Sequence, residues 1–406
     1  MAKLKDIDIQ QFLDELESIR SPDGFHSFRF DELTTIINSF VEFDESIPQS
    51  SRYPIVFASL MGSGAKNKVT KEKFLKYLNQ NEKKYLNTPN KKFYYLSSLS
   101  FVLPKDLNRI RLNGLTINFG ISYPTKFTRD SLNISHSLLE KEKQTIAYTK
   151  CWIHTPARTQ FEACEKAQQS IDLLRAIWNL KLNNSMRASS GFPKPVNTII
   201  TGPVHTIHTS NGKPAGSTYW YEPNFPESFP PKPLNSDYLK TRKFEKFFLR
   251  YLRKSSYQEI LIDALLRYCR ALDSTDFQTA FVKLWSVLET LTDTDNAYKE
   301  TIKRCSFLFQ NREYHRNVLD HLRRQRNSYV HRGFEMAEPE GILYQLQSYV
   351  DHLVRFHVLR KNPFPDMKAA KEFMDMPSDP DVLLKQISKA KKALRFCGYY
   401  DKKTRA

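Results

Sequence analysis

The segment EPNFPESFPPKP, residues 222–233, divides the chain into two parts with different patterning. Its five prolines favour an extended, semi-rigid connector, because proline fixes φ and donates no backbone hydrogen bond. Before it, helical and strand patterns alternate; after it, the pattern is helical throughout. The sequence therefore predicts an α+β chain with a mixed α/β domain at 1–222, a linker at 223–235, an all-α bundle at 236–361 and a basic helical tail at 362–406.

Two periodicities predict the mixed domain. Apolar residues recur at helical spacing in 9–19 and in 70–86, which predicts two amphipathic helices. Strict alternation predicts a half-buried strand at Leu115, Ile117, Phe119 and Ile121. Two apolar runs, 196–208 and 217–221, flank the turn segment SNGKPAG and so predict a β-hairpin.

The helical part contains six segments with apolar residues at helical spacing. These segments are 237–253, 257–272, 276–292, 297–309, 313–331 and 341–359. Gly333 follows the fifth segment, where a glycine is the usual C-terminal cap. The sequence thus predicts a bundle of at least six helices.

The fifth predicted helix carries the pattern RN-x-x-x-H twice. The downstream copy has Arg326, Asn327 and His331, and the upstream copy has Arg316 and His321. A guanidinium stabilises negative charge on phosphate oxygens and an imidazole transfers protons near neutral pH, so this pair suits phosphodiester cleavage. A helix turns about 100° per residue, so the two copies point in directions about 80° apart.

The apolar stripe of this helix distinguishes the two copies. The stripe consists of Tyr314, Val318, Leu319, Leu322, Tyr329 and Val330. Arg326 falls on the stripe, where an unpaired charge is costly, whereas the upstream copy lies to its sides and suits a solvated face. Glu289, four residues after Trp285, can meet Arg326 across a helix pair; the alternative is a boundary carboxylate that points to water. We therefore assign Arg326, Asn327 and His331 as catalytic and Glu289 as supporting.

The segment 236–361 resembles a HEPN domain, most of all the ApeA-like branch found in bacterial defence proteins. The resemblance is carried by the helix LWSVLETLT with Glu289 and by the helix end RQRNSYVHRG with Arg326, Asn327 and His331. It implies a helical bundle that dimerises and acts as a metal-independent endoribonuclease. It also implies a toxic effector in anti-phage defence by abortive infection.

The charge of the chain favours a polyanionic partner. Its 62 Lys and Arg residues against 44 Asp and Glu residues give a formal charge of +18. The densest part, 299–332, has nine basic and three acidic side chains, and RNA, with tRNA as one candidate, is the natural partner. Arg323, Arg324 and Arg332 are the predicted RNA contacts. The alternative is a basic protein without a nucleic-acid partner.

Several kinds of site are not indicated. Five scattered cysteines without a CxxC pair predict a reducing compartment and neither disulfides nor a zinc site. His205 and His208 lie on a predicted strand and point to opposite faces, which makes them a poor metal pair. No apolar run approaches the ~20 residues of a membrane span, and no signal peptide opens the chain. We expect a cytoplasmic protein without a cofactor, metal or membrane partner.

RNA cleavage is the favoured function. The ribose 2′-hydroxyl would attack the phosphorus, His331 would move protons, Arg326 would stabilise the phosphorane, and Asn327 would orient the guanidinium or donate to phosphate. Arg326 and His331 lie about 140° apart around the helix, so a compact site needs two copies and we expect a homodimer.

Two other functions stay open. The rival is a non-catalytic, dimerising RNA-binding or regulatory module in which Arg326 and Glu289 form a structural ion pair. A DNA-binding regulator would need a recognition helix, which the sequence does not show. For 1–222 we expect either a sensor of a signal, phage-derived as the resemblance implies, or a domain that positions substrate RNA.

Overall fold

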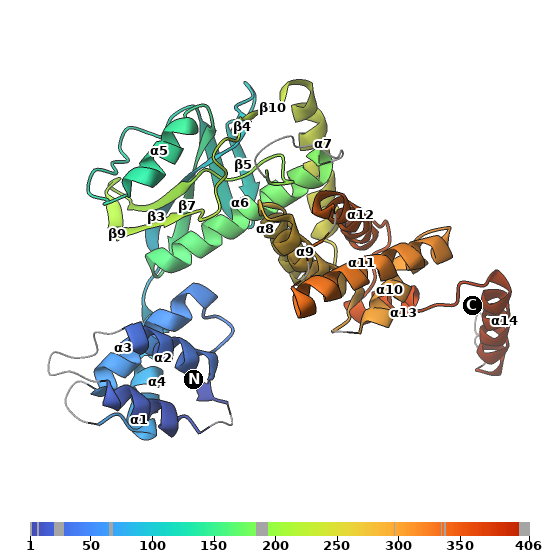
Figure 1. Ribbon diagram of the computed structural model, residues 1–406, viewed down its shortest axis with the longest axis horizontal. Helices are drawn as coiled ribbons and strands as arrows, with labels where there is room; N and C mark the ends of the chain where they lie inside the picture. Colours follow the sequence, from blue (N-terminus) through green and yellow to red (C-terminus); the bar gives the residue numbers. More distant parts are fainter. Residues whose placement is uncertain are drawn as a thin grey trace, which may run out of the picture. The chain divides into compact units, whose positions relative to one another are not determined.

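The regular structure of the described residues consists of helices, a six-stranded sheet and two two-stranded sheets, so the predicted α+β class is confirmed (Figure 1). The computed structural model describes residues 2–5, 8–19, 28–64, 68–183, 194–295, 297–333, 335–336 and 338–397. The chain forms two units. Unit 1 comprises Met1–Ile171 and Thr201–Pro223, and unit 2 comprises Asp172–Ile200 and Asn224–Ala406.

Unit 1 begins with a small helical subdomain. Its elements are β1 (Lys3–Leu4), α1 (Gln10–Ser18), α2 (Phe28–Ser39), β2 (Val41–Glu42), α3 (Gln49–Gly64) and α4 (Lys71–Asn87). Their apolar faces meet in one cluster that includes Leu13, Phe30, Val56 and Phe74. Thr70 caps α4 by accepting a hydrogen bond from the backbone N–H of Lys73. The helices predicted at 9–19 and 70–86 are confirmed.

The rest of unit 1 is built on an antiparallel sheet with the order β5-β6-β7-β3-β8-β9. The elements are β3 (Lys91–Leu99), β4 (Phe101–Val102), β5 (Arg109–Leu112), β6 (Leu115–Gly120), α5 (His136–Gln144), β7 (Thr149–Ala157), β8 (Val204–Thr209) and β9 (Pro214–Tyr221). The strand predicted from alternation is β6, in which Ile117 and Phe119 are buried. The prediction was wrong at Ile121, which follows the strand and is 83% exposed.

The predicted hairpin is β8–β9, and its turn requires glycine. Gly212 has a φ of +86°, and a Cβ there would lie 1.9 Å from the carbonyl oxygen of Lys126. The hairpin begins at Val204 rather than at residue 196. Residues 196–200 belong instead to unit 2, where buried polar side chains hold them.

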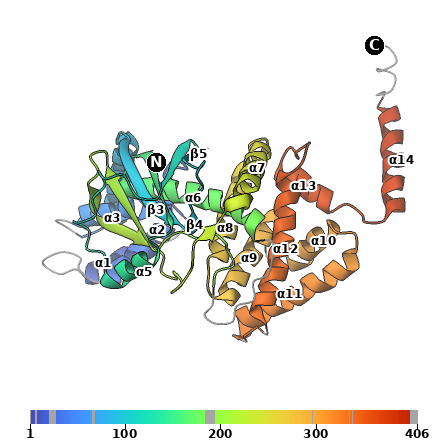
Figure 2. The ribbon, with the colours of Figure 1, turned by 90° about the horizontal axis from the view of Figure 1, so that it is seen from above.

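Unit 2 is helical apart from the short strand β10 (Lys232–Pro233). It contains the second half of α6 (Gln160–Leu182), then α7 (Asn235–Leu252), α8 (Gln258–Leu272), α9 (Phe277–Thr292), α10 (Tyr298–Phe307), α11 (Arg312–Arg332), α12 (Pro339–Val358), α13 (Met367–Met374) and α14 (Pro380–Phe396). All six predicted helices are present as α7 to α12. The central α9 packs against α8 and α12 (Figure 2).

The units depart from the predicted domain limits of 1–222 and 236–361. Residues 172–200 belong to unit 2 because α6 is one continuous helix whose second half is buried there. Trp178, for example, donates from its indole nitrogen to Glu245 of α7 at 2.7 Å. The linker at 223–235 is therefore one of several crossings between the units.

The predicted tail at 362–406 also divides. Helix α13 is an integral part of unit 2: Met367, Ala370 and Met374 are buried, and Arg304 of α10 binds Asp375 with two hydrogen bonds. Helix α14, in contrast, has no buried residue. None of the described helices is long and apolar enough to cross a membrane.

Candidate functional site

The candidate site lies on the last turns of α11. Asn311 begins this helix by accepting from the N–H of Tyr314, and Gly333 ends it with a φ of +67°, as predicted for the cap. Leu319 and Leu322 are buried and define the inward face. The predicted stripe was wrong in two places, because Tyr314 and Val330 are exposed.

Arg326 lies on the inward face, as its place on the stripe predicts. Its Nη1 donates to the hydroxyl of Tyr298 at 2.7 Å and to Oδ1 of Asn327 at 3.2 Å. Its guanidinium carbon also lies 5.2 Å from the centre of the Tyr298 ring. Among the described residues, no hydrogen-bond partner meets its buried Nε. The guanidinium is thus held in one orientation, and its Nε–H is a donor that these contacts do not use.

Glu289 lies near Arg326 but does not bind it. Its carboxylate accepts from the indole nitrogen of Trp285 at 3.1 Å, and within the described ranges no ion pair joins it to Arg326. Burial raises the pKa of Glu289, and the indole hydrogen bond and the charge of Arg326 only partly offset this. Glu289 therefore does not make the predicted contact with Arg326, and Tyr298 holds the guanidinium instead.

His331 lies on the outer face of α11. It is exposed and lines a hollow of about 510 Å³ together with Arg324, Gln325, Asn327, Ser328 and Arg332. Arg326 and His331 of one chain therefore lie on different faces of α11, as the angle of about 140° between them predicts. Asn327 links the two faces. Its Oδ1 accepts a hydrogen bond from Arg326, and the residue lies one turn before His331 on the same face of the helix.

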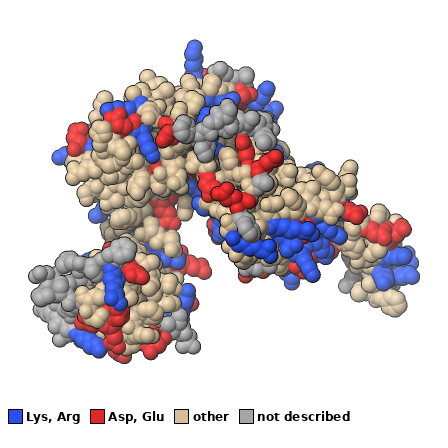
Figure 3. Space-filling model, viewed as in Figure 1, with Lys and Arg blue, Asp and Glu red and all other residues tan. Residues whose placement is uncertain are grey.

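The predicted RNA contacts are partly neutralised. Arg323 and Arg324 share Asp320, each at 2.9 Å. Burial alone would raise the pKa of Asp320, but the two guanidinium groups outweigh it and lower that pKa. Arg332 is exposed at the helix end. Lys and Arg side chains gather over α10 and α11, which leaves this surface positive (Figure 3).

The upstream copy of the motif behaves as a solvated face. Arg316 and His321 are both exposed, in agreement with their predicted position beside the stripe. His321 is therefore matched to His331 in residue type, helix and exposure, which makes it a useful control.

Two histidines of unit 1, His205 and His208, are buried and hydrogen-bonded. Nδ1 of His205 meets the hydroxyl of Ser97 at 2.9 Å, and its Nε2 meets Glu222 at 3.2 Å. His208 bonds through Nδ1 to the carbonyl of Gly212 and through Nε2 to Thr206. Across the described ranges, no group of three or more His, Cys, Asp and Glu residues is placed to hold a metal ion.

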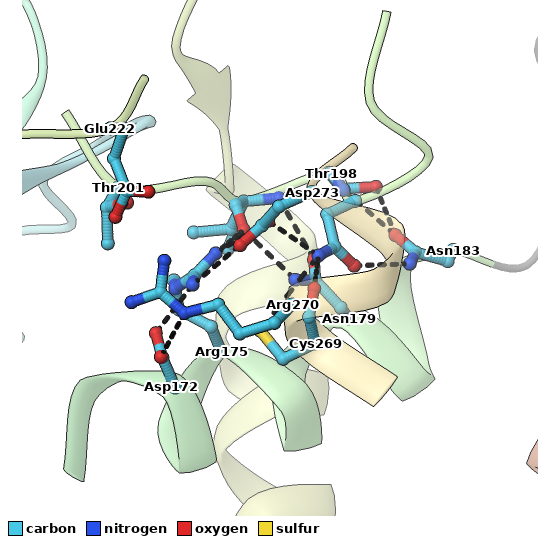
Figure 4. A network of polar contacts seen from close by, with 12 residues as sticks. Asp172, Arg175, Asn179, Asn183, Thr198, Thr201, Glu222, Cys269, Arg270 and Asp273 are labelled. Atoms are coloured by element: carbon cyan, nitrogen blue, oxygen red, sulfur yellow. Dashed lines mark hydrogen bonds and ion pairs between the residues drawn. The ribbon is translucent and has the colours of Figure 1, made fainter. Parts of the chain in front are cut away.

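A buried polar network was not predicted (Figure 4). Arg175 of α6, fully buried, binds both carboxylate oxygens of Asp273 at 2.9 Å and Asp172 at 2.6 Å. Burial alone would lower the pKa of Arg175, but the two carboxylates outweigh it and hold that pKa well above its ordinary value. Asn197 donates to Asp273 at 2.7 Å and to the carbonyl of Cys269 at 2.8 Å. The network ties α6, the 196–200 segment and α8 together, which is a structural role.

Tyr298 is the site residue that the sequence analysis missed. It begins α10, which joins α11 through a short turn, so the antiparallel pair places the start of one helix beside the end of the other. This hairpin geometry was the available signal.

Comparison with known proteins adds no family: no family model matches the chain, and no curated protein or solved structure is significantly similar to it. The HEPN resemblance stays a prediction from the motif on α11 and the helix α9.

Proposed function

We propose that this protein is a metal-independent endoribonuclease whose site is built from the α11 helices of two copies. The observation that carries the proposal is the chain of contacts from Tyr298 through Arg326 to Asn327, which ends at the hollow lined by His331. It connects an oriented cation, with a donor left over, to an exposed imidazole on a positively charged surface.

The reaction uses the groups of this surface. The 2′-hydroxyl of one ribose attacks the adjacent phosphorus while one His331 accepts its proton. The second copy's His331 supplies a proton to the departing 5′-oxygen, because one imidazole does not easily fill both roles. Arg326 stabilises the charged phosphorane, and Asn327 orients its guanidinium. The products are a 2′,3′-cyclic phosphate and a 5′-hydroxyl.

The product ends test this proposal. Purified full-length protein would be incubated with total RNA and with tRNA in excess chelator, and the new ends mapped. Cyclic phosphate and 5′-hydroxyl ends are expected, with undiminished cleavage in chelator. Cleavage that requires a divalent cation, or that leaves 5′-phosphate ends, contradicts the mechanism.

A second candidate is a dimerising RNA-binding or regulatory module without catalysis. It is favoured by the half-buried, tyrosine-held position of Arg326 and by the separation of Arg326 from His331. Under this function the wild-type protein retains RNA on a filter but leaves it intact. His331→Ala then changes retention only slightly, since one exposed imidazole adds little to a multivalent electrostatic surface.

For unit 1 we propose a sensor that restrains the nuclease until a phage-derived signal is bound; the alternative is positioning of substrate RNA. A fragment that starts at residue 236 cannot separate these roles, because it lacks Trp178, Arg175 and the rest of 172–200. Expression of the full chain in cells separates them. A sensor leaves the cells healthy until infection, and His331→Ala abolishes the infection-dependent toxicity; toxicity without infection favours substrate positioning.

A further inference from the structure

Helix α14 is an ordered element without a packing partner in the described chain. It spans Pro380–Phe396, begins with a cap at Asp379, and has no buried residue. Its apolar face is open to solvent: Ile387 is 50% and Leu394 40% exposed. Isolated helices of this length are marginal in water, and most helical stability in proteins comes from packing an amphipathic face. A surface outside the described chain must therefore receive this face.

The two sides of α14 differ in chemistry. One face carries apolar side chains at helical spacing: Leu383, Ile387, Ala390 and Leu394. The rest of its surface carries five basic side chains and one acidic side chain: Lys385, Lys389, Lys391, Lys392, Arg395 and Asp381. Around the helix, Lys391 lies about 80° to one side of Leu383 and Lys389 about 120° to the other. Lys391 thus lies at one border of the apolar face, and the other four cations lie on the polar side of the helix.

The excess of cations on α14 argues against two partners. A second α14 would gather five more cations around the shared seam, and like charges around such a seam are destabilising. RNA would satisfy the cations but would leave Leu383 and Ile387 in water. The partner is therefore apolar where it meets the face and anionic around it.

We propose that α14 lies in the surface of an anionic lipid bilayer. A bilayer supplies an apolar layer beneath a plane of negative headgroups, which suits a helix with one apolar face and a cationic polar side. The sequence after the helix favours lipid over an acidic protein: Phe396, Tyr399 and Tyr400 are followed by Lys402 and Lys403. Aromatic rings concentrate at membrane interfaces, and a basic cluster adds attraction to anionic lipid. The proposal is independent of the nuclease activity and revises the expectation of no membrane partner, which concerned spanning segments.

Vesicle co-sedimentation of the full chain tests the proposal. The probes are vesicles of phosphatidylcholine alone and vesicles that also contain phosphatidylglycerol. Ile387→Glu should lower the partition onto anionic vesicles at least tenfold, because it places a charge in the buried face. Lys389→Ala with Lys391→Ala should lower it about 25-fold, at about fivefold for each cation. The matched control is Ile260→Glu, at a 40%-exposed isoleucine of α8, which should leave the partition unchanged.

Because α14 is unburied, none of its variants should alter the fold, which circular dichroism checks. Binding to anionic vesicles that Ile387→Glu removes and Ile260→Glu retains supports the proposal. Equal binding to neutral vesicles, or no binding to either, overturns it. A change in the mass of Ile387→Glu by light scattering without vesicles also overturns it, in favour of a second copy as the partner.

Discussion

Replacing Asp273 by alanine should destabilise unit 2 strongly. The substitution removes both hydrogen bonds from Asp273 to the fully buried guanidinium of Arg175 and one of the acceptors of Asn197. Asp172 and the carbonyl of Ile199 remain as partners of Arg175. Breaking a buried pair by removing one partner costs about 3–5 kcal/mol, since the remaining charge stays buried. Because Asp172 still binds Arg175, we expect about 3 kcal/mol.

Asp263→Ala is the matched control. Asp263 and Arg267 also form an ion pair at 2.8 Å, but their side chains are 48% and 52% exposed. An exposed pair of this kind contributes about 0.5 kcal/mol or less. The two substitutions thus remove the same residue type from pairs of similar length and differ in burial.

Hydrogen exchange followed by mass spectrometry measures the difference locally. Peptides from 172–183 and 258–272 should exchange about 10²-fold faster in Asp273→Ala, and peptides from 91–99 in unit 1 should change less. Asp263→Ala should leave all of these peptides nearly unchanged. If the two variants exchanged alike, the network of Figure 4 would not be the element that ties 172–200 into unit 2.

Three further predictions concern pH, orientation and assembly. Burial lowers the pKa of His357 from 6.5 to about 4, so the unfolded state takes up a proton first as the pH falls. Unit 2 should therefore lose up to about 3 kcal/mol of stability between pH 6.5 and 4, as measured by urea unfolding. His357→Gln should flatten this pH dependence. Tyr298→Phe should cost about 1 kcal/mol and slow RNA cleavage more than tenfold by releasing Arg326, whereas Tyr314→Phe, at an exposed tyrosine, should change neither. Light scattering should give twice the chain mass of 47.6 kDa, and a fully active monomer would refute the two-copy site.

The helices of unit 2 were predictable because burial follows a local pattern. On α9, the helix predicted at 276–292, the apolar residues at helical spacing are all buried: Phe281, Leu284, Trp285, Leu288 and Leu291. Arg326 was placed on the inward face of α11 by the same reasoning. Periodicity reports which face of a helix is buried, and on α11 it fails only near the ends of the stripe, where Tyr314 and Val330 are exposed.

Partners distant in sequence were not predictable in this way. Arg175 and Asp273 are 98 residues apart, so no local pattern shows that the second half of α6 belongs to the helical unit. The anchoring of Arg326 by Tyr298 depends on how α10 and α11 pair. Periodicity equally predicts amphipathic faces on α13 and α14 and does not say that only the first is buried.

Cleavage by His331→Ala and His321→Ala, compared in chelator, tests the central claim most directly. Both histidines are exposed on α11, so each substitution should change stability by less than about 0.5 kcal/mol. We expect His331→Ala to lower the cleavage rate about 10²- to 10⁴-fold and His321→Ala to stay within about twofold of wild type. Loss of cleavage in His321→Ala with activity retained in His331→Ala would contradict the assignment of the site to the last turns of α11.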